Sequence, residues 1–136
     1  RQMCIRDRSK TNSKNDKILV IDDDQNTRDI LSRMLKNAGW IAITAKDGKD
    51  GLRKIKQDPA MIVLDLEMPR MDGFEFIEKT QEDGIKIPIV VFSGKDITAV
   101  EEKMLSKFTE GIVKKESKVD TLVQEVNQIL KGENSK

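Results

Sequence analysis

The sequence contains no histidine and no tyrosine, and its single cysteine, Cys4, has no partner for an internal disulfide. Histidine is the commonest transition-metal ligand and a frequent general base. Its absence excludes zinc or copper centres built on imidazole, and it excludes Ser-His-Asp catalysis. No apolar run approaches the roughly 20 residues of a membrane-spanning helix, and no signal-peptide pattern is present. We therefore expect a soluble, cytoplasmic protein.

Charge of neither sign is in excess. Lys and Arg number 25 against 24 Asp and Glu, which gives a formal net charge of +1 over 136 residues. This balance provides no bulk attraction to nucleic acid or to an anionic membrane surface, so we expect neither as a partner. The length suits one domain. Because no excess of charge directs the protein to a partner, function should reside in a local cluster of residues.

The two ends of the chain have the composition of tails. Residues 3–8 have the amino-acid sequence encoded by a transposase adapter that is common in sequencing libraries. We therefore interpret residues 1–8 as a sequencing artefact. Residues 9–16 are polar and rich in turn formers, which is typical of a linker. Residues 17–131 are predicted to form one folded domain, followed by a polar tail at 132–136.

Between these tails, short apolar runs alternate with helical patterns, which is typical of βα units and of a parallel sheet covered on both faces. Strands are predicted at 18–21, 40–44, 61–64, 87–93 and 112–113. Apolar periodicity predicts helices at 25–38, at 49–56, from Gly73 onward, across 97–108 and at 119–130. The predicted fold class is α/β.

Polar side chains follow four of the five predicted strands, at the point where each strand ends. They are Asp22, Asp23 and Asp24 after the first strand, Asp65 after the third, Ser93 after the fourth, and Lys114 and Lys115 after the fifth. Because the carboxyl ends of parallel strands share one edge of a sheet, and ligands bind there, we expect these side chains to converge.

The carboxylates at this edge need a compensating charge. Two carboxylates about 4 Å apart repel by roughly 4 kcal/mol at an effective dielectric near 20, so a cluster requires a cation or shifted pKa values. Oxygen donors without imidazole or thiolate favour a hard ion, and Mg²⁺ fits best. Asp24 has a competing interpretation as the N-cap of the following helix. Asp22 and Asp23 are therefore the stronger candidates for metal ligands.

Four segments, "KILVIDDD", "IVLDLEMPRMDGFEF", "IPIVVFSGKD" and "GIVKKES", occur in this order. Together they resemble the receiver domain of two-component response regulators, over about residues 17–131. The resemblance implies a flavodoxin-like (βα)5 fold with a five-stranded parallel sheet in the order 2-1-3-4-5. It also implies a phosphorelay signalling role, with a histidine kinase or a histidine phosphotransfer domain as phosphodonor and an effector protein downstream.

The resemblance also implies roles for individual residues. Asp65 matches the aspartate that accepts the phosphoryl group, and Asp22 and Asp23 match the acidic pair that holds Mg²⁺ together with it. Glu67 matches the position whose backbone carbonyl completes the protein's share of the metal coordination. Ser93 matches the hydroxyl that bonds the phosphoryl group. A metal and a lysine would neutralise the charge that builds up when a carboxylate attacks phosphorus.

The active-site lysine has two candidates, Lys114 and Lys115. A gapless alignment of "GIVKKES" with the family pattern favours Lys115, and Lys114 stays open. The same register puts Ile112 at the usual aromatic switch position, as the partner of Ser93. We therefore expect phosphorylation to shift the surface formed by the fourth helix, fifth strand and fifth helix without the rotation of an aromatic ring.

Two rival functions fit part of the pattern. Asp22 and Asp24 have the Asp-x-Asp spacing of Mg²⁺-dependent phosphatases that form an aspartyl-phosphate, but 136 residues leave no room for their substrate-covering cap. A pseudo-receiver binding module would lack the phosphoacceptor or the acidic pair, and both are present. We therefore expect a domain that catalyses only its own phosphorylation and dephosphorylation. It could be the C-terminal receiver of a hybrid sensor kinase or a stand-alone regulator.

Overall fold

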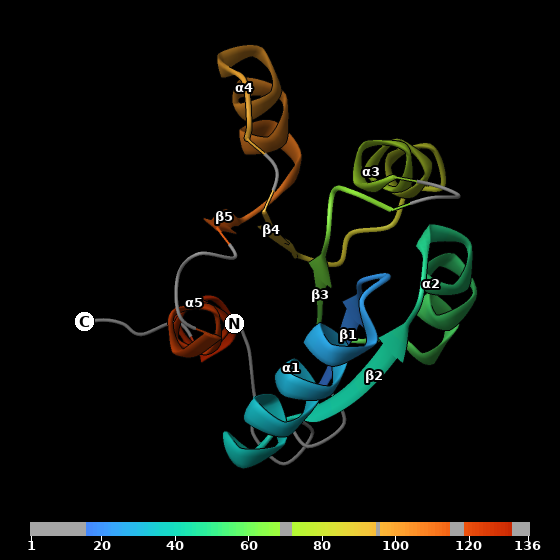
Figure 1. The fold of residues 1–136 in the computed structure, drawn as a ribbon. Coiled ribbons are helices and arrows are strands. Elements are labelled where there is room, and N and C mark those ends of the chain that lie inside the picture. The colour runs from blue at the N-terminus through green and yellow to red at the C-terminus, as the bar shows by residue number, and fades with distance from the viewer. Residues whose placement is uncertain (1–15, 69–71, 95, 115–118, 132–136) are drawn as a thin grey trace.

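The computed structural model describes residues 16–68, 72–94, 96–114 and 119–131. Five strands alternate with five helices along the chain (Figure 1). The strands are β1 (Lys17–Ile21), β2 (Ile41–Ala45), β3 (Met61–Leu64), β4 (Ile89–Ser93) and β5 (Gly111–Lys114). The helices are α1 (Gln25–Asn37), α2 (Gly48–Lys54), α3 (Gly73–Glu82), α4 (Ala99–Phe108) and α5 (Val119–Lys131), with a 3-10 turn η2 (Ile55–Gln57) after α2.

The strands form one parallel sheet in the order β2-β1-β3-β4-β5, which confirms the predicted fold class and strand order. Helices α1 and α5 cover one face of the sheet, and α2, α3 and α4 cover the other (Figure 1). A parallel sheet requires each connection to cross back over a face, which is why every strand is followed by a helix.

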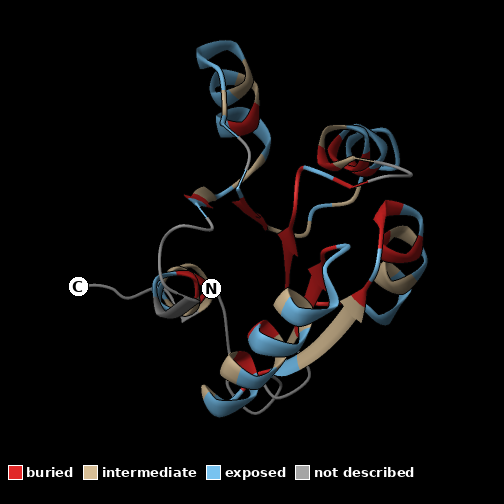
Figure 2. Ribbon diagram, in the orientation of Figure 1, coloured by how far each residue is buried: buried red, intermediate tan, exposed pale blue. Residues whose placement is uncertain are grey.

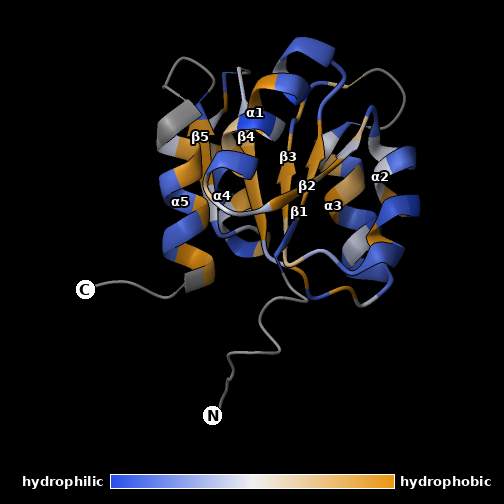
Figure 3. Ribbon diagram, turned by 90° about the horizontal axis from the view of Figure 1, so that it is seen from below, coloured by the Kyte–Doolittle hydropathy of each residue, from blue (hydrophilic) through white to orange (hydrophobic). Residues whose placement is uncertain are grey.

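The core consists of two apolar layers, one on each face of the sheet. Ile18 and Val20 of β1 belong to the cluster that contains residues of α1 and α5. Leu19 and Ile21 belong to the cluster on the opposite face, which contains residues of α3 and α4. Because successive strand residues point to opposite faces, this double burial explains the unbroken apolar runs in the sequence (Figures 2 and 3).

Side-chain caps fix where four of the helices begin. Asp24, Asp47, Asp72 and Thr98 are the N-cap residues of α1, α2, α3 and α4, and each side chain accepts a hydrogen bond from a backbone N–H in the first turn. This satisfies one of the donors that a helix start leaves unpaired. The caps therefore set the lengths of the loops between strands and helices at the carboxyl edge of the sheet.

Several predicted boundaries shift by one or two residues. β2 begins at Ile41 rather than at Trp40, whose buried indole instead donates through Nε1 to Asn127 Oδ1 of α5 at 3.0 Å. β4 begins at Ile89 rather than at residue 87, directly after Pro88, which has no N–H to donate to the ladder. The first shift accompanies a tertiary contact and the second follows from a missing backbone donor, and hydrophobic periodicity encodes neither.

Helix α4 differs most from its prediction. It begins after the Thr98 cap, so the predicted residue Ile97 lies outside it. Val100 and Phe108 are 79% and 41% exposed, whereas Leu105 is fully buried in the core. The capping box between Thr98 and Glu101 sets the helix start, and the face that meets the sheet is then the one that carries Leu105.

A buried carboxylate joins β2 to α2. Asp50 is buried, and it accepts hydrogen bonds from the Lys46 N–H (3.3 Å) and from the Arg53 guanidinium, while Lys54 Nζ lies 3.5 Å from Oδ2. Burial by itself would raise the pKa of Asp50. The hydrogen bonds from Arg53 and Lys46, together with the charges of Lys54 and Arg53, outweigh burial and hold the pKa below its ordinary value.

We expect Asp50→Asn to lower the free energy of unfolding by about 1–2 kcal/mol at pH 7, because the variant loses charge-assisted hydrogen bonds. The pKa of Asp50 is lower in the folded chain than in the unfolded one. The stabilisation is therefore present above the unfolded-state pKa and is lost as the pH falls through the folded-state pKa. Urea denaturation at pH 7 and in the acid range measures this, with Asp29→Asn on the exposed surface of α1 as the control. A deficit that is the same at every pH would contradict the electrostatic origin.

Candidate functional site

Two aspartates stand one residue beyond neighbouring strands at the carboxyl edge of the sheet. Asp22 follows β1 and Asp65 follows β3, and the register pairs Ile21 with Leu64 directly before them. The ladder extends through both aspartates, because the Asp22 N–H donates to Ala45 O (3.1 Å) and the Asp65 N–H donates to Ile21 O (3.0 Å). Both backbones are therefore held as firmly as the strands that precede them.

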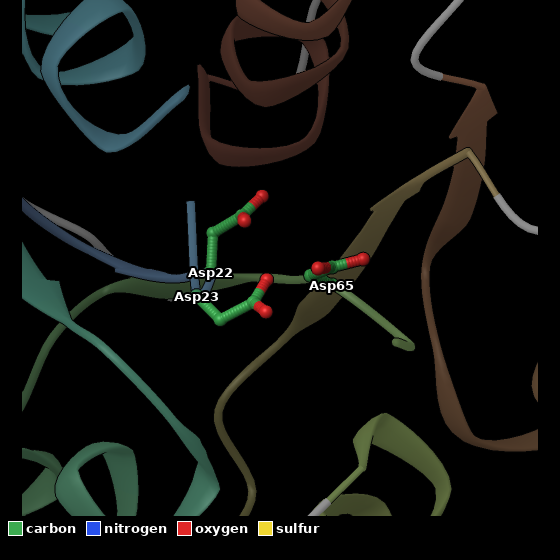
Figure 4. A group of neighbouring side chains, drawn as sticks. All are labelled: Asp22, Asp23 and Asp65. Carbon is green, nitrogen blue, oxygen red and sulfur yellow. The ribbon is translucent and has the colours of Figure 1, made fainter. Parts of the chain in front are cut away.

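Asp22, Asp23 and Asp65 form one cluster of carboxylates. Each offers an oxygen, and these oxygens all lie within 4.8 Å of one another. Figure 4 shows the three side chains gathered around a common space at the ends of the strands. Asp22 and Asp65 are 1% and 3% exposed, whereas Asp23 is open to solvent. Two carboxylates of the cluster are thus buried, and the third is accessible to solvent.

The charges of this cluster match a hard divalent cation. Two carboxylate oxygens about 5 Å apart repel by roughly 3 kcal/mol at an effective dielectric near 20, and each pair in the cluster adds such a cost. Mg²⁺ prefers oxygen ligands and commonly takes one or two carboxylates while keeping waters or phosphate oxygens. The two buried carboxylates could supply fixed ligands, and water could supply others beside the exposed Asp23. The residues present therefore fit Mg²⁺.

The backbone around Asp22 is held by a short local network. The Asp24 N–H donates to Asp22 Oδ1 at 2.9 Å, and Arg28 Nη1 donates to the Asp22 carbonyl oxygen at 2.5 Å. Asp24 itself caps α1, because its Oδ2 accepts from the Thr27 N–H (3.3 Å) and from the Thr27 hydroxyl (2.6 Å). The capping interpretation of Asp24 is thereby confirmed. The contact of Arg28 was missed at the sequence level, where its only signal is an arginine in the first turn of the helix after the acidic run.

The loop after Asp65 is held by close backbone contacts. The Glu67 N–H donates to Asp65 Oδ1 at 3.3 Å, and the Gly73 N–H donates to Leu66 O at 3.1 Å. A Cβ atom at Gly73 would lie 2.7 Å from Leu66 Cδ2 and 2.8 Å from the Asp65 carbonyl oxygen. Helix α3 therefore begins in direct contact with the backbone at Asp65, at a distance that only glycine permits.

The remaining predicted site residues lie on β4 and β5. Ser93 is buried at the end of β4 and pairs with Lys114 across the sheet. Ile112 is half-buried and packs against the core cluster on the face of α3 and α4. Lys114 is exposed at the end of β5. Lys115 lies outside the described residues, so no contact distance decides between the two lysine candidates.

Comparison with known proteins identifies the same pattern. The family model for the response regulator receiver domain matches residues 18–127. The alkaline phosphatase synthesis transcriptional regulatory protein PhoP of Bacillus subtilis is 36% identical over 83 residues, which is 60% of this chain and 35% of that protein. The response regulator MprA of Mycolicibacterium vanbaalenii is 40% identical over 81 residues, 59% of this chain and 35% of that protein. The aligned segment thus spans about a third of the length of these curated relatives.

Solved structures of a chemotaxis protein and of a receiver domain share the fold. The chemotaxis protein CheY4 of Vibrio cholerae is 27% identical, with a TM-score of 0.75 over 84% of this chain and 98% of that one. The receiver domain of the Francisella response regulator 1452 is also 27% identical, with a TM-score of 0.78 over 85% of this chain and 97% of that one. Within the described part of the chain, no helix combines the length and the apolar character that crossing a bilayer requires.

Proposed function

Because the chain belongs to the response regulator receiver domain family, we propose that Asp65 accepts a phosphoryl group from a phosphohistidine of a histidine kinase or of a histidine phosphotransfer domain. The observation that best supports this is the meeting of Asp22, Asp23 and Asp65 at the carboxyl edge of the sheet. A receiver domain is a signalling domain rather than a classical enzyme. Its chemistry is confined to its own phosphorylation and dephosphorylation.

In the proposed reaction, a carboxylate oxygen of Asp65 attacks the phosphorus in line with the P–N bond. An acyl phosphate O–P bond forms and the P–N bond breaks, and the electron pair stays on the donor nitrogen. The donor ring, already protonated on its other nitrogen, leaves as neutral imidazole. The nucleophile and the phosphoryl group are both anionic, so charge is the main obstacle. Mg²⁺ held by Asp22, Asp23, Asp65 and the Glu67 carbonyl would neutralise part of that charge. The Glu67 N–H, which donates to Asp65 Oδ1, orients the nucleophile.

Alternation along β5 supports Lys115 as the lysine that pairs with the phosphorylated carboxylate. The face covered by α1 and α5 includes Val20 of β1, Val63 of β3 and Val113 of β5. Each of these valines stands two positions before a polar residue, which is Asp22, Asp65 and Lys115 respectively. Lys114 directly follows Val113, and its side chain is exposed. The Lys115 ammonium would supply a point charge to the phosphoryl oxygens.

We further propose that Ser93 and Ile112 carry the response. Both continue the sheet face covered by α3 and α4, and Ser93 ends the strand that leads toward α4. The Ser93 hydroxyl would donate to a phosphoryl oxygen and draw the segment between β4 and α4 toward Asp65. Ile112 would repack beside it, and the surface of α4, β5 and α5 would shift toward an effector protein. We propose two contexts for this domain, the C-terminal receiver of a hybrid kinase and a stand-alone regulator, and the aligned third of the curated relatives does not decide between them.

Incubation with acetyl phosphate, a small phosphodonor, tests the function directly. We expect the intact chain to gain the mass of one phosphoryl group in the presence of Mg²⁺ and to gain none when EDTA removes the metal. A phosphorylation-independent pseudo-receiver would gain no mass under either condition. An aspartyl-phosphate phosphatase would turn over a phosphomonoester such as p-nitrophenyl phosphate, whereas a receiver should release no measurable product. Either of these two results would refute the proposal.

A further inference from the structure

Arg28 contacts the acidic cluster through the backbone rather than through a carboxylate. It lies in the first turn of α1, is half-buried, and donates from Nη1 to the Asp22 carbonyl oxygen at 2.5 Å. That carbonyl belongs to the peptide group that joins Asp22 to Asp23. The guanidinium therefore touches the peptide between two of the three clustered aspartates.

This peptide group decides where Asp23 points. Asp22 is held independently, because its N–H donates to Ala45 O. The Asp23 side chain is exposed, so packing does little to fix it, and its direction follows from the backbone. A rotation about the Cα–C bond of Asp22 would move its carbonyl oxygen and Asp23 together, leave the buried Asp22 side chain in place and swing the Asp23 carboxylate away from Asp65.

We propose that Arg28 is a positioning residue that locks the Asp22–Asp23 peptide, so that Asp23 joins Asp22 and Asp65 around a single cation. This role rests on the proposed function, since it concerns the Mg²⁺ site of the receiver domain. This role extends the site from the strand ends to the first turn of α1. A positively charged side chain would then strengthen the binding of a positively charged ion.

Coulomb's law alone predicts the opposite effect of Arg28. A guanidinium beside a cation site repels the incoming ion, so removing its charge should tighten Mg²⁺ binding slightly, by an amount that solvent and salt reduce. Removing a group that orients a ligand should weaken binding instead, and loss of such an outer partner typically costs about 10-fold to 100-fold in metal affinity. The sign of the change in affinity therefore separates the two effects.

The test is a calorimetric titration of Mg²⁺ into the full chain and into Arg28→Met, which keeps the length and the helix propensity of the side chain but removes its donors. We expect the Mg²⁺ dissociation constant to rise about 10-fold. The matched control is Arg33→Met, which removes the same charge from the exposed surface of the same helix. We expect the control to bind Mg²⁺ as tightly as the parent chain or slightly more tightly.

Two further measurements separate positioning from a loss of folding. Amide hydrogen exchange of Asp24, whose N–H donates to Asp22, should accelerate in Arg28→Met and stay unchanged in Arg33→Met. Arg28→Lys, which keeps one donor and the charge, should bind Mg²⁺ with an affinity between those of the parent and Arg28→Met. It also keeps the test decisive should Arg28→Met fail to fold.

Unchanged or tighter Mg²⁺ binding by Arg28→Met would overturn the positioning role and leave the proposed function intact. Equal weakening in Arg33→Met would overturn it as well, because the effect would then belong to charge in general. A parent chain that binds no Mg²⁺ would refute the metal site of the proposed function itself, and this role of Arg28 with it.

Discussion

Asp65→Asn is expected to abolish phosphorylation by acetyl phosphate, a loss on the order of 10³-fold or more, because the carboxamide lacks the anionic oxygen that attacks phosphorus. The same change should make the metal-free chain more stable. Asp65 is buried within 4.8 Å of two other carboxylates, so the neutral side chain relieves repulsion worth roughly 1–3 kcal/mol. Intact-mass analysis after treatment with acetyl phosphate and Mg²⁺ measures the first effect, and thermal unfolding in EDTA measures the second.

Measuring both effects excludes misfolding as the reason for lost phosphorylation. A variant that lost phosphorylation because it misfolded would melt at a lower temperature, whereas we expect a higher one. Asp29→Asn removes one negative charge from the exposed surface of α1, outside the cluster, and should change neither quantity. Acid-labile phosphorylation of Asp65→Asn at the level of the parent chain would show that another residue is the acceptor.

Gly73→Ala is expected to damage both the fold and the site. A Cβ at this position would lie 2.8 Å from the Asp65 carbonyl oxygen and 2.8 Å from Leu66 Cα, so backbone rather than a flexible side chain must move. Overpacking of this kind typically costs about 1–3 kcal/mol, and we expect the upper part of that range in urea denaturation. Because the displaced backbone belongs to Asp65 and Leu66, we also expect the dissociation constant for Mg²⁺ to rise about 10-fold.

Gly84→Ala is the matched control for this change. Gly84 follows the end of α3 with a φ of +71°, and a Cβ there would meet nothing within 4 Å. Alanine in this left-handed conformation costs about 1–2 kcal/mol of stability but moves no backbone near the carboxylates. Mg²⁺ affinity should therefore stay at the parent value. If Gly73→Ala lowered stability but left Mg²⁺ affinity equally unchanged, the proposed coupling between the start of α3 and Asp65 would be wrong.

The contacts that control the candidate site differ in whether the sequence alone predicts them. Asp22 and Asp65 are evident because each ends an apolar run, and parallel strands bring such ends to one edge. Asp24 is evident as a cap because it precedes a helical pattern. The Arg28 contact depends on the angle between α1 and β1, which the packing of Leu31 and Leu35 against the sheet sets. The Gly73 contact depends on how closely α3 approaches the loop after β3.

Helix α4 shows the reverse case, in which the sequence pattern suggests burial that the structure does not show. Val100 and Phe108 continue an apolar pattern and yet are exposed, whereas Leu105 is buried. A local pattern indicates that a helix has an apolar side, but it does not say which residues of that side the sheet covers. The start of the helix at the Thr98 cap and its position over the sheet decide that.

By itself, the sequence determined the alternation of strands and helices, the α/β class and the acidic residues at the strand ends. Each of these follows from a period of two or of about 3.6 residues, or from a residue's place at the end of such a pattern. Three contacts could be read only from the folded chain: the carboxylate oxygens within 4.8 Å of one another, the hydrogen bond of Arg28 to the peptide between Asp22 and Asp23, and the hydrogen bond of Trp40 to Asn127. These contacts depend on the relative placement of whole elements, and many packed residues fix that placement together.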